Sequence, residues 1–317
     1  MSEKESSKTI HAHPVLIRLA TRNSPLAIWQ AEYVKQLLCD AYADLRVDII
    51  GMTSKGDRLL DRTLAAVGGK GLFMKELEEA MLAGEADIAV HSMKDVTVKL
   101  PQGLEIAAVC EREQPQDAFV ANHYSCIDEL PDGAVVGTAS LRRKTQLMNR
   151  YPNLVYKNLR GNVNTRLGKL DAGEYDAIIL AAAGLIRLGF EQRISQYLPI
   201  ETCLPAIGQG VVGIECRSND MATKKLLQGI SNVNSAYCIA AERSLNEALD
   251  GGCQVPIAGH AVLDGGQLEL QGSVGDIETG QLLYAVATAP VSEADRLGKE
   301  VAESLLEQGA GELLAKL

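Results

Sequence analysis

The sequence predicts an α/β protein with largely parallel sheets, because short β-rich apolar runs alternate along it with stretches of helical periodicity. Such an alternation favours parallel pairing, since each helix carries the chain back to the start of the next strand. The predicted strands are Leu16–Ala20, Val47–Met52, Ala86–His91, Leu104–Val109, Ala134–Thr138, Leu154–Leu159, Tyr175–Leu180 and Val211–Cys216.

Between these runs, apolar residues recur every three or four positions, as on the buried face of a helix. One stripe is formed by Leu26, Trp29, Tyr33, Val34, Leu37 and Leu38, and another by Leu72, Leu77, Ala80 and Met81.

A strand end followed by a capping serine occurs twice, and each time an arginine is close by. In the first instance Ser24 fits the N-cap position and Pro25 the first helical position, with Arg22 just before them. Unpaired N–H groups and the helix dipole make such a helix start a natural anion site.

In the second instance Ser140 can cap a helix whose first turn contains Arg142 and Arg143. Positive charge in a first turn is slightly unfavourable for the helix, which indicates that these arginines serve a ligand. Two anion sites at strand ends in two α/β halves predict a cleft between two similar domains.

The chain has 317 residues, enough for two or three domains. Glu111–Gln116 and Cys203–Gly210 are candidate boundaries, and the strand after Gly210 is expected to return to the first sheet. After Asn232 a long helical stretch, three strand candidates and a final helix predict a small α+β domain. We expect a flexible tail (1–13), a first domain (14–112 and 209–230), a second domain (113–208) and a third domain (231–317).

Composition excludes several classes of function. A net charge of −10 disfavours nucleic-acid binding, and no apolar run is long enough to span a bilayer. The seven cysteines are odd in number and widely spaced, which argues against a disulfide framework or a metal site and for a reducing compartment. With no secretory signal, a cytoplasmic location is expected. The acidic surface and the lack of a spare apolar helix make a monomer the default expectation. Arginines nevertheless gather in one segment, which predicts a small polyanionic ligand, although each alone is typical of a solvated surface: Arg142, Arg143, Arg160, Arg166 and Arg187.

Three further stretches contain groups suited to chemistry. VHSMKDV at Val90–Val96 places Lys94 beside Asp95 at a strand end, which is either an ordinary strand-to-loop transition or a catalytic carboxylate next to a cation. VGGKGLF at Val67–Phe73 does not have the spacing of a P-loop, and it fits either a flexible linker or a mobile loop over a cleft.

GGCQVP at Gly251–Pro256 is a turn in which Cys253 should be exposed. Most cysteines are buried and inert, but an exposed one in a glycine-rich loop is a candidate nucleophile or attachment point.

These motifs, together with LRR at Leu141–Arg143, LRGNVNTRL at Leu159–Leu167 and LPAIGQG at Leu204–Gly210, resemble the porphobilinogen deaminase family. The resemblance runs in order from about Val15 to the C-terminus. It implies two domains like those of periplasmic binding proteins, joined by two hinge segments, and a small third domain. It also implies an enzyme that joins four porphobilinogen molecules with loss of ammonia and releases hydroxymethylbilane by hydrolysis, in haem biosynthesis.

The resemblance assigns roles to individual residues. Cys253 would hold one dipyrromethane cofactor through a thioether, and Asp95 would be the catalytic acid and base. Lys70 and Phe73 would belong to a loop that covers the site. The residues implied to contact the cofactor are Lys94, Asp95, Ser140, Arg142, Arg143, Arg160 and Arg166, and those implied to contact substrate are Arg22, Ser24, Arg187 and Gln209.

The implied chemistry agrees with the residues. The cofactor with four added pyrroles would have about a dozen negative charges at neutral pH, which an arginine-lined cleft suits. One carboxylate can bind pyrrole N–H groups, stabilise positive charge and help proton transfer. The alternative is a non-catalytic binding protein for a small dicarboxylate, which explains the arginines equally well but leaves Cys253 and the third domain without a role.

Overall fold

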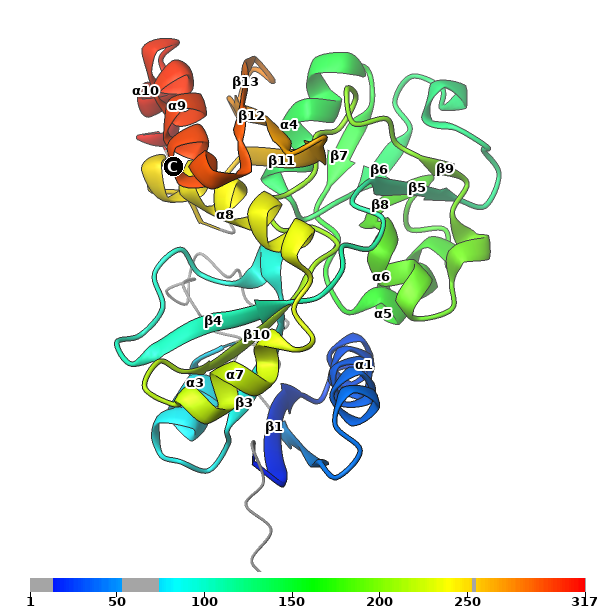
Figure 1. Cartoon of the computed structure of the whole chain (residues 1–317). Helices are drawn as coiled ribbons and strands as arrows, with labels where there is room; N and C mark the ends of the chain where they lie inside the picture. The colour runs from blue at the N-terminus through cyan, green and yellow to red at the C-terminus, as the bar shows by residue number, and fades with distance from the viewer. Residues whose placement is uncertain (1–13, 53–73, 253–254, 317) are drawn as a thin grey trace, which may run out of the picture.

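The computed structural model describes residues 14–52, 74–252 and 255–316 and contains three β-sheets with helices packed around them (Figure 1). Each sheet contributes to a hydrophobic core of its own. The predicted site residues Lys70, Phe73 and Cys253 lie outside the described residues.

The first sheet combines strands from two distant parts of the chain. Its strands β1, β2 and β3 pair in parallel, whereas β10 lies antiparallel between β3 and β4. Figure 1 shows β10 in this sheet, although it follows the whole second sheet in sequence. In spatial order the strands are β2 (Arg46–Met52), β1 (Leu16–Arg22), β3 (Ile88–Ser92), β10 (Val212–Arg217) and β4 (Leu104–Val109).

The second sheet repeats this plan. Its strands β6, β7 and β8 pair in parallel, whereas β5 pairs antiparallel with β8 and with the short β9. In spatial order the strands are β7 (Val155–Lys157), β6 (Val135–Gly137), β8 (Ala177–Ala181), β5 (Asp117–Ala121) and β9 (Gln196–Tyr197).

The prediction of largely parallel sheets is therefore wrong for the pairings that involve β5 and β10. Neither strand is reached through a covering helix. The chain enters β5 through residues 110–116, here called the first crossover, and enters β10 through residues 198–211, the second crossover. An extended segment that arrives from another sheet can run antiparallel to the strands that it joins. The predicted return of the strand after Gly210 to the first sheet is confirmed.

Helices cover both sheets and begin where their caps predict. Ser24 accepts a hydrogen bond from the Ala27 amide, with Pro25 as the first helical residue, and Ser140 accepts one from the Arg143 amide. The helices of the first sheet are α1 (Pro25–Ala41), α3 (Lys75–Leu82) and α7 (Met221–Gln228), and those of the second are α4 (Leu141–Arg150), α5 (Val163–Asp171) and α6 (Ala182–Arg187).

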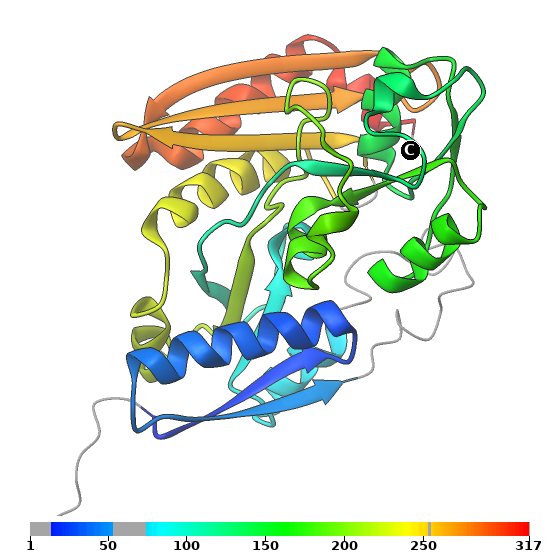
Figure 2. The ribbon, with the colours of Figure 1, turned by 90° about the vertical axis from the view of Figure 1, so that its right-hand side faces the viewer.

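The C-terminal part is a three-stranded antiparallel sheet packed against two long helices (Figure 2). Its elements are α8 (Val233–Ala248), β11 (Ile257–Asp264), β12 (Gln267–Gly275), β13 (Leu282–Pro290), α9 (Ala294–Glu307) and α10 (Ala310–Leu314). The predicted small α+β unit is confirmed. Single 3₁₀ turns occupy Met93–Asp95, Ile127–Glu129, Glu191–Arg193 and Val291–Glu293.

Over the described ranges, no helix combines the length and apolar character needed to cross a membrane. The six cysteines within those ranges are free thiols, and the same residues contain no group of three or more side chains that could hold a metal ion.

Candidate active site

The Lys94–Asp95 pair lies in a 3₁₀ turn that follows β3 directly. Met93 anchors this turn, because its side chain is buried and its amide donates to the Val211 carbonyl at 2.9 Å. Asp95 itself is exposed. A rigid strand end therefore presents a solvent-accessible carboxylate beside a lysine.

Lys94 lies within the electrostatic reach of the second sheet. Burial lowers the pKa of its ammonium group to about 8, with Asp95 opposing the shift and Arg143 reinforcing it. Arg142 and Asp117 act on the same ammonium group. The structure thus brings the turn after β3 close to the start of α4, as the prediction of a shared cleft requires.

The arginine pair of α4 is buried and has an acidic partner. Arg142 donates from Nη1 to Asp117 Oδ2 at 2.7 Å, and Arg143 donates to Asp117 Oδ1 from Nε at 2.9 Å and from Nη2 at 2.7 Å. Both guanidinium groups also donate to backbone carbonyls, of Leu204 and Ile179 respectively. This pairing fixes the two arginines before any ligand binds.

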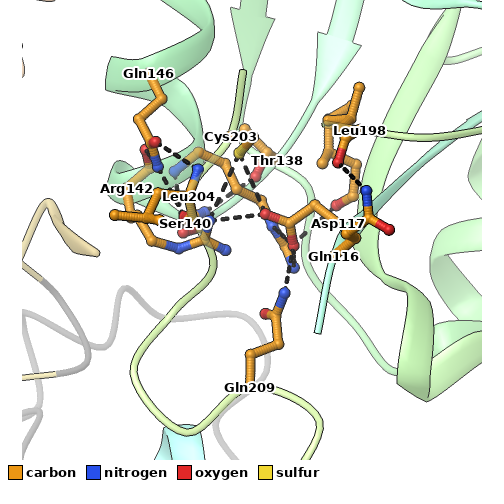
Figure 3. Close-up of polar contacts among 12 residues, drawn as sticks. Gln116, Asp117, Thr138, Ser140, Arg142, Gln146, Leu198, Cys203, Leu204 and Gln209 are labelled. Atoms are coloured by element: carbon orange, nitrogen blue, oxygen red, sulfur yellow. Dashed lines mark hydrogen bonds and ion pairs between the residues drawn. The ribbon is translucent and has the colours of Figure 1, made fainter. Parts of the chain in front are cut away.

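Asp117 also receives groups from the second crossover (Figure 3). Gln209 Nε2 donates to Asp117 Oδ1 at 2.9 Å and also to the Pro115 carbonyl at 2.6 Å, and the Cys203 thiol donates to Oδ2 at 3.2 Å. Although burial opposes ionisation, Arg142 and Arg143 hold the pKa of Asp117 far below its usual range. Asp117 is therefore an ionised carboxylate at the junction of both crossovers.

This arrangement revises the reason for two arginines in a first turn. The sequence pattern predicted that their charge serves a ligand alone, whereas Asp117 neutralises one of the two positive charges. One net charge remains, and Arg142 Nε is buried with no hydrogen-bond partner among the described residues. Asp117 escaped prediction because it begins β5, a strand that the apolar pattern did not reveal.

Arg160 and Arg166 add to the positive charge beside this pair. Asn162 caps α5 by accepting from the Thr165 amide, and Arg166 Nε donates back to the Gly161 carbonyl at 2.8 Å. Burial, then Arg143 and Arg160, lower the pKa of Arg166 to about 10, while Asp95 opposes the shift. Arg166 stays protonated at neutral pH and lies among cations with Asp95 as its acidic neighbour.

Arg22 and Ser24 lie at the carboxyl end of β1. Because β1 and β3 are parallel, this end lies at the same sheet edge as the turn that contains Lys94 and Asp95. Ser24 is engaged as the helix cap, so its role in the described structure is to form the start of α1.

Arg187 belongs to α6, the helix that directly follows β8. It ends α6, where Nη2 donates to the Gly210 carbonyl at 2.7 Å and the guanidinium lies over the ring of Trp29, 5.5 Å from its centroid. A pocket joins it to the turn that contains Lys94, and the lining of this pocket includes Leu26, Ser92, Lys94, Gly184, Arg187 and Gly210.

Glu242 of α8 is a second acidic residue that the sequence argument missed. Its fully buried carboxylate accepts from Arg112 of the first crossover at 2.7 Å and from the Gly208 amide of the second at 2.7 Å. It also accepts from the Ala261 amide of β11 at 2.8 Å. One side chain thus joins the C-terminal domain to both crossovers.

The site fits a ligand that has several carboxylates. Positive charge is in excess among the described groups that interact electrostatically there. The basic side chains are Lys94, Arg142, Arg143, Arg160 and Arg166, and the acidic ones are Asp95 and Asp117. Partly buried guanidinium groups favour planar, bidentate anions such as carboxylates.

Two family models match the chain. The model described as "Porphobilinogen deaminase, dipyromethane cofactor binding domain" matches residues 17–225, and "Porphobilinogen deaminase, C-terminal domain" matches residues 236–307. The first model covers the two sheets that the crossovers connect, and the second covers the C-terminal sheet with its helices. The acetate and propionate groups of a dipyrromethane suit the excess of positive charge.

Binding proteins are among the solved structures to which the chain is similar. The methionine binding protein MetQ is 16% identical, with 76% of this chain and 98% of that chain covered and a TM-score of 0.44. The BvgS periplasmic VFT2 domain of Bordetella pertussis is 17% identical, with 73% and 92% covered and a TM-score of 0.41. At these values the likeness says nothing of ligand or activity.

The family models cover most of the chain, both the two sheets that the crossovers connect and the C-terminal unit. They favour the enzyme over the non-catalytic binding protein. The activity of this enzyme is the polymerisation of porphobilinogen to hydroxymethylbilane with loss of ammonia, on a dipyrromethane cofactor. The chain belongs to the porphobilinogen deaminase family.

Proposed function

We propose that Asp95 is the catalytic group of this reaction. The observation that supports it most directly is the exposed carboxylate on a fixed turn, facing cations that the second sheet contributes. Its oxygens accept hydrogen bonds from pyrrole N–H groups and stabilise the positive charge that develops on the substrate nitrogen as ammonia leaves. A carboxylate beside Arg166 and Lys94 is suited to this role.

The basic residues hold the carboxylates of the bound molecules. Lys94, Arg142, Arg143, Arg160 and Arg166, with Ser140 at the helix start, bind the acetate and propionate groups of the cofactor. The substrate's own acetate and propionate are bound by Arg22, Arg187 and the Ser24 hydroxyl, whose hydrogen is still a donor while its oxygen caps α1. Gln209, whose amide nitrogen donates to Asp117 and Pro115, contributes to this site through its bond to Asp117. Each contact orients a pyrrole ring, and orientation supplies much of the rate in a reaction between two bound rings.

The cofactor would be attached through Cys253, and Lys70 and Phe73 would belong to the loop that covers the site. When bound, the dipyrromethane supplies the free pyrrole position to which substrate is added. Glu242 supports this assignment, because it ties β11, the strand that follows the GGCQVP loop, to both crossovers through the Ala261 amide, Arg112 and Gly208. The enzyme acts in haem biosynthesis as a cytoplasmic monomer, without nucleic-acid or membrane partners.

Intact mass of the denatured protein tests the attachment. We expect the wild type to exceed its sequence mass by two linked pyrrole units, and Cys253→Ala to have the unmodified mass. Cys39→Ala is the matched control, since Cys39 is a half-buried thiol of α1 and should leave the adduct in place. An adduct retained by Cys253→Ala would exclude Cys253.

If the wild type has the unmodified mass, preincubation with porphobilinogen separates two explanations. An apo-enzyme acquires the adduct and then releases ammonia from further substrate. A binding protein does neither.

A further inference from the structure

Arg187 reaches from the second sheet to the first. It is the last residue of α6, and its side chain is 8% exposed. Its Nη2 atom donates to Gly210 of the second crossover at 2.7 Å. Of the described residues, none provides a hydrogen-bond partner for its buried Nε. The Nη2 atom of the guanidinium is thus fixed, and Nε is a donor without a partner among the described residues.

Trp29 supports the face of this guanidinium. The centre of the guanidinium lies 5.5 Å from the centroid of the Trp29 ring, within the range of a cation–π contact. Trp29 in turn stacks on Tyr33, with ring centroids 5.3 Å apart and planes inclined by 15°. Both aromatic residues belong to α1, which lies below α6 in Figure 1. A helix of the first sheet therefore provides the surface on which an arginine of the second rests.

The same α1 segment contacts the catalytic turn. Gln30, next to Trp29, donates from Nε2 to Ser92 Oγ at 2.8 Å, and Ser92 directly precedes the turn that contains Lys94. Ser92, Lys94 and Arg187 all line one pocket. The position of Arg187 relative to Lys94 is thus set through α1.

We propose that Trp29 is a positioning residue, whose indole face holds the Arg187 guanidinium in the wall of this pocket for a substrate carboxylate. The proposal rests on the proposed function, which assigns Arg187 to substrate binding. Without the indole, Arg187 keeps its charge and its bond to Gly210, but the plane of its guanidinium group no longer has a fixed orientation. Trp29 then contributes to substrate affinity without touching the reacting atoms.

Tryptophan emission tests the contact itself. Trp29 is the only tryptophan of the sequence, so the emission of the folded protein reports on its surroundings alone. We expect Arg187→Met to change the intensity or wavelength of that emission, and Arg187→Lys to change it less. Arg296→Met is the matched control, because Arg296 is an exposed arginine of α9 paired with Glu293 and Glu300. Identical emission from the wild type and Arg187→Met would overturn the contact.

Kinetics test the positioning role in the cofactor-loaded enzyme. We expect Trp29→Leu to raise KM for porphobilinogen by about 3- to 30-fold, the range of a partly desolvated cation–π contact, with kcat within about threefold. Trp29→Phe should restore most of the affinity, because it keeps an aromatic face. Tyr284→Leu, an exposed aromatic residue of β13, should leave KM unchanged.

A double-mutant cycle separates positioning from general stabilisation. If Trp29 acts through Arg187, Trp29→Leu should have no further effect on KM in an Arg187→Met background. Additive effects on KM, or a loss of kcat with unchanged KM, would overturn the proposal. A wild type that releases no ammonia would overturn the proposed function and this proposal with it, and the emission change would show that the contact nevertheless exists.

Discussion

A single oxygen of Asp117, Oδ1, accepts two hydrogen bonds from the guanidinium of Arg143, from Nε at 2.9 Å and from Nη2 at 2.7 Å. The other oxygen accepts from Arg142. Because this buried carboxylate fixes both arginines, it decides both the stability of the second domain and the direction in which its anion-binding groups point.

Asp117→Asn should lower the free energy of unfolding by about 3–5 kcal/mol, because it leaves two buried guanidinium groups without their anion. Chemical denaturation measures this loss. Asp171→Asn is the control, since Asp171 pairs with Arg193 in an exposed ion pair and should cost at most about 1 kcal/mol. Equal losses in the two variants would contradict the assigned role.

Stability should also fall in acid because of Asp117. Its pKa is far below the ordinary value of 3.8 in the folded state, so its contribution is complete above about pH 4 and is lost progressively at lower pH. We expect the unfolding free energy of the wild type to fall more steeply below pH 4 than that of Asp117→Asn. Parallel pH profiles would show that Asp117 is not the group responsible.

Asp95→Asn should reduce turnover by at least about 100-fold, because the carboxylate that stabilises charge and transfers protons is lost. Its exposed position predicts an unchanged unfolding free energy. Ammonia release and chemical denaturation check the two parts. Asp264→Asn, at an exposed hairpin end, should behave as the wild type. Near-normal turnover in cofactor-loaded Asp95→Asn would exclude Asp95.

The affinity for porphobilinogen should depend on the protonation of Lys94, because Lys94 lines the same pocket as Arg187, to which we assign a substrate carboxylate. Burial lowers the pKa of Lys94 to about 8, so its positive charge is present at lower pH and lost as the pH rises through that value. KM should therefore rise above about pH 8, and Lys94→Arg should move this rise to higher pH because arginine stays charged. Lys99→Arg, at an exposed position, should keep the wild-type profile.

Gly210→Ala should destabilise the protein more than Gly266→Ala. Both glycines have a positive φ, +87° and +83°, so each substitution costs about 1–2 kcal/mol of backbone strain. At Gly210 the added methyl group would also collide with the Glu113 carbonyl oxygen, whereas at Gly266 no atom lies within 4 Å. Chemical denaturation should show a larger loss in the free energy of unfolding for Gly210→Ala. Equal losses in the two variants would mean that the second crossover shifts to make room for the methyl group without strain.

The apolar pattern predicted most of the fold but not two strands of the second sheet. Most predicted strands agree with the structure to within about two residues, since a buried strand appears as a short apolar run. β9 has two residues, too few for a pattern, and β5 begins with a buried aspartate next to the polar first crossover. Local sequence also contains no sign of the direction in which a crossover enters a sheet.

The site was predictable from its motifs, but its internal partners were not. Lys94 and Asp95 belong to one motif, and Arg142 and Arg143 to another. Asp117 and Glu242 hold these parts together from positions far away in the sequence, so that only the folded chain relates them. The contact between Arg187 and Trp29 was hidden for the same reason. Trp29 belongs to a helix of the first sheet, and in the sequence it is one residue of an apolar helical stripe.

The central position of β10 has a consequence for biosynthesis. All strands of the second sheet lie between residues 117 and 197, whereas the first sheet requires β10 at residues 212–217 to join β3 to β4. A ribosome therefore releases a complete second sheet while the first still has two unpaired edges. Such edges invite pairing with other chains. The first sheet of this protein thus waits for residues 212–217 during the interval in which its other four strands have already been made.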